Sequence, residues 1–346
     1  MTQELKLAVF GGVLPGTLTG LAMLAAWILR ARKLDREARS SANIPDSIRT
    51  RPGRGPVWVA PLVLAVGYLG ADYATNGVMK LWPDGNTYRF PHAALLLGLV
   101  GVLEGVLGGG LARAVGVAVA RAAALAGGYW MLVEGYHDAG TITDSTFYGG
   151  MGVVAVGGAW VIGLAELGAA SASARVIAPL AALIGAACIG LLFASGYALV
   201  AQSSAVFVAW GVSTAMAAWI VWLYGRRRGL HANARVVWLD RGSMTVFAGL
   251  VVLHAVGARF HTYPEPHGAP GLLLIALAPA GLAVLGLRGL HEPERSHDWR
   301  AGKARIALAL LAILATLGAA TVPILLDQPS DDAGGTSDEY DGYYPG

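Results

Sequence analysis

Ten long apolar stretches divide this chain, and they leave little of it for a soluble fold. Each stretch is 17 to 25 residues long, and a helix of about 20 apolar residues crosses the roughly 30 Å hydrocarbon core of a bilayer. We therefore expect an all-α fold, a polytopic transmembrane helix bundle that occupies residues 1–326. The predicted spans are 7–29, 57–79, 91–112, 114–136, 149–170, 176–200, 205–224, 243–259, 270–287 and 306–326.

The overall composition agrees with a membrane class. Hydrophobic residues make up 55% of the chain and charged residues 14%, whereas an ordinary soluble domain is about 25% charged. The net charge of +3 would suggest a nucleic-acid partner in a soluble protein, but membrane proteins gather Lys and Arg on their cytoplasmic side for insertion. We therefore expect the lipid bilayer as a partner and no nucleic acid.

The distribution of basic residues predicts the orientation. If the amino terminus is outside, 20 of the 25 Lys and Arg residues fall in cytoplasmic loops, as the positive-inside rule requires. Those loops are 30–56, the turn near 113, the turn near 175, 225–242 and 288–305. We therefore predict ten spans in the plasma (inner) membrane, with both termini exoplasmic. The first stretch is expected to be an uncleaved helix, because basic residues follow it instead of a small-residue cleavage site.

Two further features concern the organisation of the chain. Residues 327–346 are rich in Asp, Gly, Ser and Pro, a composition that predicts an acidic disordered tail. Two sets of five spans with opposite starting sides would suit an inverted repeat. The loops in corresponding positions differ strongly, however, so the sequence offers little support for such a repeat.

Glu104 and Arg121 are predicted to form an intramembrane ion pair. Gly101 and Gly105 flank Glu104 in a GxxxG spacing that allows close helix packing, so Glu104 is expected to face protein. If the turn lies near residues 112 and 113, both charged residues stand roughly 13 Å from it at 1.5 Å per residue. This pair is expected either to clamp the helix hairpin or to line an ion or proton path.

A second set of polar residues lies toward the predicted outer side. Asp72 and Asn76 share one helix face with Tyr68, while Glu134 and His254 lie on other spans. Ionisable groups at membrane depth are costly and are therefore functional candidates. We expect these groups either to line an outward-facing cavity or to make separate local hydrogen bonds. No HxxxH or HExxH spacing supports a metal site.

Three other residues receive simpler interpretations. Glu166, near the inner end of its span, is expected to reach the interface or Arg175. Trp210 is expected to act as an interfacial anchor. Pro279 is expected to bend the ninth span.

The sequence excludes several functions and leaves three open. It has no lysine at membrane depth for retinal and no GxxxxGK[ST] phosphate loop, and it indicates no cofactor. The leading hypothesis is a small-solute or proton-coupled carrier or channel with candidate path residues Asp72, Asn76, Glu104, Arg121, Glu134 and His254. The first alternative is a membrane-embedded enzyme that acts on a lipid-linked substrate from the outer side, with His254, Asp72 or Glu134 as acid or base and the catalytic residue otherwise unknown. The second is a scaffold subunit that binds other membrane subunits.

Overall fold

The computed structural model of the chain is an all-α helical bundle, as the apolar pattern predicts. It describes residues 9–40, 53–54, 59–76, 89–106, 111–194, 204–230, 237–239, 241–261, 269–287 and 299–326. The predicted acidic tail, 327–346, lies outside these residues. The elements are η1 (Val9–Val13), α2 (Leu14–Ser40), β1 (Gly53–Arg54), α4 (Val59–Asn76), α5 (Phe90–Val106), α6 (Leu111–Asp138), α7 (Asp144–Ser171), α8 (Ala174–Ala194), α10 (Ala205–Arg227), β2 (Val237–Trp238), α12 (Arg241–His261), α13 (Ala269–Leu277), η3 (Ala278–Gly286) and α14 (Trp299–Leu326).

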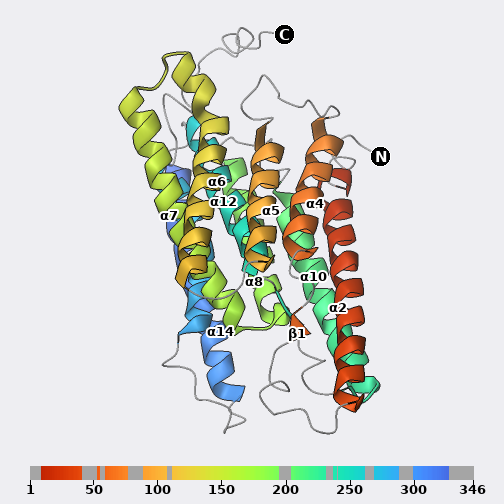
Figure 1. Cartoon of the computed structure of the whole chain (residues 1–346). Coiled ribbons are helices and arrows are strands. Elements are labelled where there is room, and N and C mark those ends of the chain that lie inside the picture. Colours follow the sequence, from red (N-terminus) through yellow and green to blue (C-terminus); the bar gives the residue numbers. More distant parts are fainter. Residues whose placement is uncertain are drawn as a thin grey trace.

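These helices have the character of membrane spans. Among the described residues, seven helices are long and apolar enough to cross a bilayer, namely α2, α6, α7, α8, α10, α12 and α14. Three shorter apolar segments accompany them, in α4, in α5 and in α13 with η3. Successive segments run up and down the bundle (Figure 1), and the length and composition of the seven long helices fit a membrane-spanning bundle.

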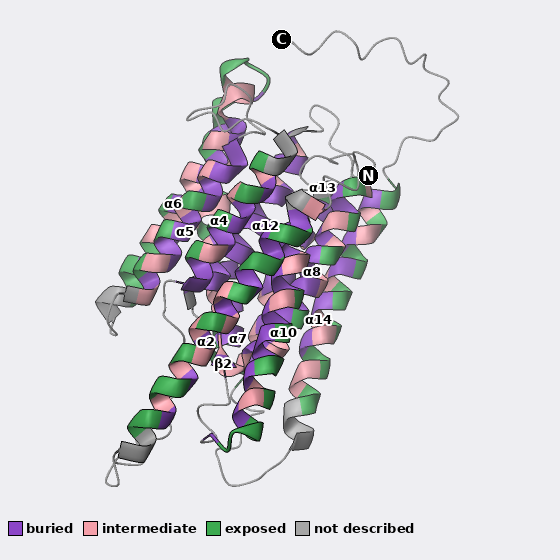
Figure 2. Ribbon diagram, turned by 90° about the vertical axis from the view of Figure 1, so that its right-hand side faces the viewer, coloured by how far each residue is buried: buried purple, intermediate pink, exposed green. Residues whose placement is uncertain are grey.

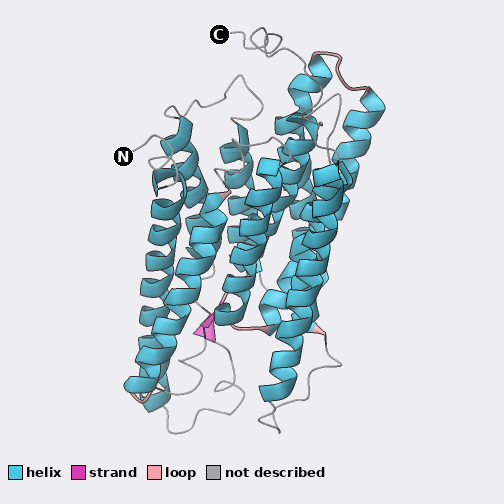
Figure 3. Ribbon diagram, turned by 180° about the vertical axis from the view of Figure 1, so that it is seen from behind, coloured by secondary structure: helices cyan, strands magenta, loops and turns pink. Residues whose placement is uncertain are grey.

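The first long helix extends well past its apolar stretch. Pro15 follows the π-helical turn η1 and lies in the first turn of α2, so the helix changes type beside the proline and continues beyond it. At its other end α2 continues to Ser40 through a basic segment, beside the end of α10 (Figures 1 and 3). We call this end of the molecule the basic end, because the last turns of α2 and α10 carry several arginines.

Pro279 changes the type of helix in the ninth apolar segment. α13 ends at Leu277, and a 3₁₀-helix, η3, begins at Ala278, because proline cannot donate a hydrogen bond to the preceding turn. A 3₁₀-helix rises about 2.0 Å per residue against 1.5 Å in an α-helix. The 18 residues of α13 and η3 therefore span roughly 31 Å instead of about 27 Å.

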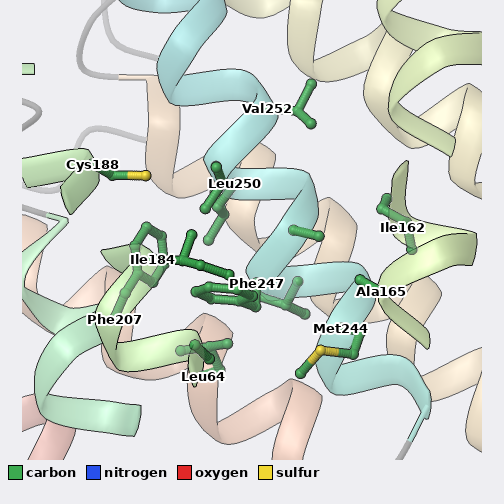
Figure 4. Close-up of a cluster of buried hydrophobic side chains, with 14 of the residues drawn as sticks. Leu64, Ile162, Ala165, Ile184, Cys188, Phe207, Met244, Phe247, Leu250 and Val252 are labelled. Carbon is green, nitrogen blue, oxygen red and sulfur yellow. The ribbon is translucent and has the colours of Figure 1, made fainter. Parts of the chain in front are cut away.

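α12 is the central helix of the bundle. In the most apolar window of its Gly242–Phe260 segment, 89% of the residues are buried. Figure 2 shows buried residues along the middle of the molecule. Phe247 and Leu250 of α12 pack against side chains from α4, α8 and α10 (Figure 4). Trp210 stacks on Phe247 at 5.8 Å between ring centroids and is fully buried. The interfacial position predicted for Trp210 is therefore wrong, because its ring faces the core.

Glycines set the closest helix contacts. A Cβ atom at Gly101 of α5 would lie 2.6 Å from the carbonyl oxygen of Gly242 in α12, so both positions require glycine. η1 and α2 meet α10 in the same way, because Gly12 of η1 and Gly16 and Gly20 of α2 face Ala205, Ala209 and Ser213. Ser213 also donates a hydrogen bond to the carbonyl oxygen of Gly16 at 2.6 Å. In lipid, where apolar burial against another helix gains little, such close packing is the main attraction between helices.

The arrangement reveals an internal repeat that is parallel and not inverted. The order α2, β1, α4, α5, α6 is repeated as α10, β2, α12, α13 with η3, α14. The equivalent helices labelled in Figure 1, which are α2 and α10, α4 and α12, and α6 and α14, point the same way. The two short strands pair in parallel, with Gly53 opposite Val237.

Sequence motifs follow the same repeat. Three motifs recur in the same order: AAWI at 25–28 and 217–220, TYxxPH at 87–92 and 262–267, and GxAR at 110–113 and 302–305. The AAWI copies are 192 positions apart, and the facing residues of α2 and α10, such as Gly16 and Ala209, are 193 apart. Nearly equivalent residues therefore contact each other across the junction of the two halves, as in an isologous interface.

Candidate functional site

The structure groups Arg121 with three other polar side chains, those of Glu104, Glu166 and Thr245. The Arg121 guanidinium makes two parallel hydrogen bonds to the Glu104 carboxylate, from Nε at 2.7 Å and from Nη2 at 2.8 Å. Nη2 also contacts Glu166 of α7, and the Thr245 hydroxyl of α12 donates to Glu104 at 2.7 Å. We call these four residues the shared-arginine cluster, because one guanidinium binds two carboxylates from different helices.

The cluster forms because of how its helices point. Side chains on a helix lean toward the N-terminus, and α6 begins at the basic end, so Arg121 leans toward that end. α5 and α7 run the opposite way (Figure 1), so Glu104 and Glu166 lean back to meet it. The contact between Gly101 of α5 and Gly242 of α12 brings Thr245 within hydrogen-bonding distance of Glu104.

Most of the cluster is shielded from solvent and lipid. Glu104 is 1% exposed, Arg121 5% and Thr245 0%, while the Glu166 side chain is 18% exposed. Buried charges of this kind are stable only when paired and hydrogen-bonded. The prediction that Glu166 reaches the interface or Arg175 is wrong, because its carboxylate turns inward to Arg121.

His254 lies in a second, separate contact. Its Nε2 is 2.7 Å from the Tyr68 hydroxyl of α4, and its Nδ1 is 2.9 Å from the Ser204 hydroxyl at the start of α10. The rings of Phe90 and Phe207 lie 4.9 and 5.4 Å from the imidazole, between centroids. Tyr68, Ser204 and His254 are all buried. We call these three residues the histidine clamp.

Glu134 belongs to a third contact. It pairs with Arg89 at the start of α5, with 2.7 Å between Glu134 Oε2 and Arg89 Nη1. The same Nη1 donates to the carbonyl oxygen of Met131 at 3.2 Å. One turn beyond the pair on α6, His137 contacts Asp144 across the turn to α7 at 2.7 Å. Glu134 thus joins the α5–α6 hairpin at the end opposite the basic end.

The six candidate path residues therefore fall into separate places. Glu104 and Arg121 lie together, while His254 and Glu134 each have different partners. Asp72 lies half-buried on α4, one turn from Tyr68 of the histidine clamp, and the Asn76 side chain is outside the described residues. Within the described part of the chain, no group of three or more His, Cys, Asp or Glu residues could hold a metal ion.

A comparison with protein-family models, with curated proteins and with solved structures finds no match to this chain. The chemistry of the two buried clusters must therefore be argued from their own geometry.

Sequence reasoning did not anticipate Ser204, Thr245 or the inward turn of Glu166. Ser204 and Thr245 are small hydroxyl residues, which are common in helix packing, so their types alone carry no signal. The rule that side chains lean toward the N-terminus of their helix, applied to oppositely directed helices, predicts a contact between Glu166 and Arg121. That inference requires only the order of the spans.

Proposed function

We propose that this protein is a ten-span, proton-coupled carrier of a small solute in the plasma (inner) membrane. The observation that carries the proposal is the shared guanidinium of Arg121, bound by Glu104 and Glu166 from two different helices. When either carboxylate takes up a proton, its hold on Arg121 weakens while the other carboxylate keeps the guanidinium. A proton can thus change which pair of helices is held together.

The packing of α12 supports a carrier whose two sides are separated by a barrier. Thr245 and His254 belong to the two polar clusters, and their separation of nine residues along α12 corresponds to about 13 Å of helix. Phe247, Leu250 and Val251 fill this interval and are at most 1% exposed. An apolar section between two buried polar groups is the arrangement expected of a closed carrier, in which α12 would move relative to its neighbours.

The internal repeat also favours transport. Many carriers consist of two parallel repeats related by an axis along the membrane normal, and their halves rock against each other. Here the two halves meet at α2 and α10, and the shared-arginine cluster joins α5 and α6 of the first half to α12 of the second.

The geometry gives less support to a membrane-embedded enzyme. Both imidazole nitrogens of His254 already have hydroxyl partners, and aromatic rings enclose the ring. A general acid or base must reach the proton that it transfers, and this imidazole is occupied by Tyr68 and Ser204.

Proton coupling is tested by the infrared spectrum of the purified protein as the buffer is made more acidic. The chain has 22 Asp and Glu residues, so the spectrum of Glu166→Gln is subtracted from that of the wild-type protein, and we expect one protonated-carboxyl band to remain in the difference. Glu134→Gln is the matched control, because Glu134 pairs with Arg89 outside the cluster, and it should keep the band.

The same variants are then placed in vesicles that contain a pH-sensitive dye, and gradients of small solutes are imposed one at a time. We expect a transported solute to move protons with the wild-type protein and not with Glu166→Gln. Solute entry without proton movement would refute coupling. Absence of both the carboxyl band and solute entry would instead favour the scaffold hypothesis.

The proposed topology places the basic end in the cytoplasm and both termini outside. Three apolar segments are short, but the 3₁₀ stretch of η3 extends one of them toward the length of a full crossing.

We expect a membrane-impermeant maleimide to label Ser145→Cys in intact cells and Glu37→Cys only after permeabilisation. Ser145 and Glu37 are exposed at opposite ends, and native Cys188 is buried, so background labelling should be low. The reverse pattern would overturn the orientation.

A further inference from the structure

The basic end holds a cavity between the last turns of α2 and α10. Its volume is about 440 Å³, and its lining residues are Arg32, Asp35, Arg36, Tyr224, Arg228 and Leu230. One wall comes from each half of the internal repeat. None of its lining residues belongs to α5, α6, α7 or α12, the helices that carry the shared-arginine cluster, so it is a separate feature of the molecule.

The lining concentrates positive charge around one tyrosine. The guanidinium carbons of Arg32 and Arg228 each lie 5.9 Å from the centre of the Tyr224 ring, and Arg32 Nη2 donates to the Tyr224 hydroxyl at 3.4 Å. With Arg36, the lining has three guanidiniums and one carboxylate, that of Asp35. Gathering like charges is unfavourable, and an anion in the cavity would offset their repulsion.

The position of the cavity also suits an anion of the membrane interface. The apolar stretch of α2 ends near residue 29, and Arg36 lies seven residues further along the same helix. At 1.5 Å per residue this is about 10 Å, which places the cavity at the level of the polar headgroups outside the hydrocarbon core. Basic pockets between helices at this depth commonly bind phosphate-bearing headgroups.

We propose that this cavity binds a phosphate group, carried either by an anionic lipid headgroup or by a small soluble molecule. The planar guanidinium matches phosphate oxygens with two parallel hydrogen bonds, and three such groups line the cavity. Buried Leu230 adds an apolar side chain to the lining. Because Arg32 and Arg36 come from α2 and Arg228 follows α10, a bound phosphate links the two halves of the protein.

The test measures the thermal stabilisation of the purified full-length protein in detergent by three probes. These are short-chain phosphatidylglycerol, glycerol 3-phosphate and short-chain phosphatidylcholine, the last being zwitterionic. A ligand that binds only the folded state raises the melting temperature with its concentration. We expect stabilisation by at least one of the first two probes, at concentrations where phosphatidylcholine has no effect.

Two variants and one control locate the binding. Arg36→Gln and Arg228→Gln should each weaken the apparent affinity about tenfold, which corresponds to losing a charged hydrogen-bonding group. The matched control is Arg227→Gln, since Arg227 is the exposed neighbour of Arg228 and does not line the cavity. It should bind as the wild type does.

The outcomes separate the two phosphate sources. Stabilisation by phosphatidylglycerol alone identifies a lipid headgroup site, and equal stabilisation by glycerol 3-phosphate identifies a site for a soluble phosphate. The proposal is overturned if neither probe stabilises the protein, or if Arg36→Gln and Arg228→Gln bind as Arg227→Gln does. None of these outcomes depends on proton coupling at Arg121.

Discussion

Replacing Arg121 by leucine is expected to destabilise the folded protein by about 3–5 kcal/mol, the cost typical of removing one partner from a buried ion pair. The substitution would leave the carboxylates of Glu104 and Glu166 facing each other without the guanidinium that they share. Unfolding of the purified protein in mixed micelles with increasing denaturing detergent measures the change.

A double substitution distinguishes charge from packing. Glu104→Leu combined with Arg121→Leu should be more stable than Arg121→Leu alone, because the buried carboxylate that lost its partner is also removed. Arg227→Leu serves as the control for losing an exposed arginine, and its effect should stay within about 0.5 kcal/mol. If Arg121→Leu unfolds at the same point as Arg227→Leu, the shared-arginine cluster does not stabilise the fold.

The second large effect is expected at the crossing of α5 and α12. Gly242→Ala should destabilise the protein by about 3 kcal/mol, at the upper end of the cost of overpacking, because the new methyl group would meet the Gly101 backbone. A backbone cannot turn aside as a flexible side chain can, so the helices must separate. Separation would also pull Thr245 away from Glu104.

Gly157→Ala on α7 is the matched control for this substitution. It is a mid-helix glycine, and a Cβ atom there would meet nothing within 4 Å. Its stability, measured by the same detergent titration, should equal or slightly exceed that of the wild type, because alanine favours helix more than glycine does. Equal losses for both alanine variants would contradict the proposed contact.

The positions of the helices were largely predictable, whereas their limits and facing sides were not. Apolar runs identify segments that prefer lipid, and every predicted span overlaps a described helix. The basic end of α2 was missed because hydropathy has no information on a polar helix that continues beyond the membrane. Trp210 was misplaced because its position near a span end does not reveal that the ring faces α12.

The candidate site was predictable only in part for a similar reason. Glu104 and Arg121 lie on adjacent helices joined by a short turn, so their relative height follows from the residue count. The partners of His254 come from α4 and α10, and which faces of distant helices meet cannot be read from spacing along one chain. The contact between α5 and α12 was predictable on one side only. The GxxxG pattern at Gly101 indicates close packing, but nothing in the sequence identifies Gly242 as its partner.

The repeat of four apolar segments bears on how such a protein could have arisen. A unit with an even number of antiparallel segments begins and ends at the same end of the bundle, so a second copy fused behind it runs in the same direction. The helical pair α7 and α8, which stands between the copies, preserves this parity. A gene duplication could therefore join two subunits that had associated side by side through α2-like helices, with no need to reverse either one. Fusion would then have allowed the copies to diverge, so that the buried arginine and its two carboxylates are confined to the first copy and the hairpin that follows it.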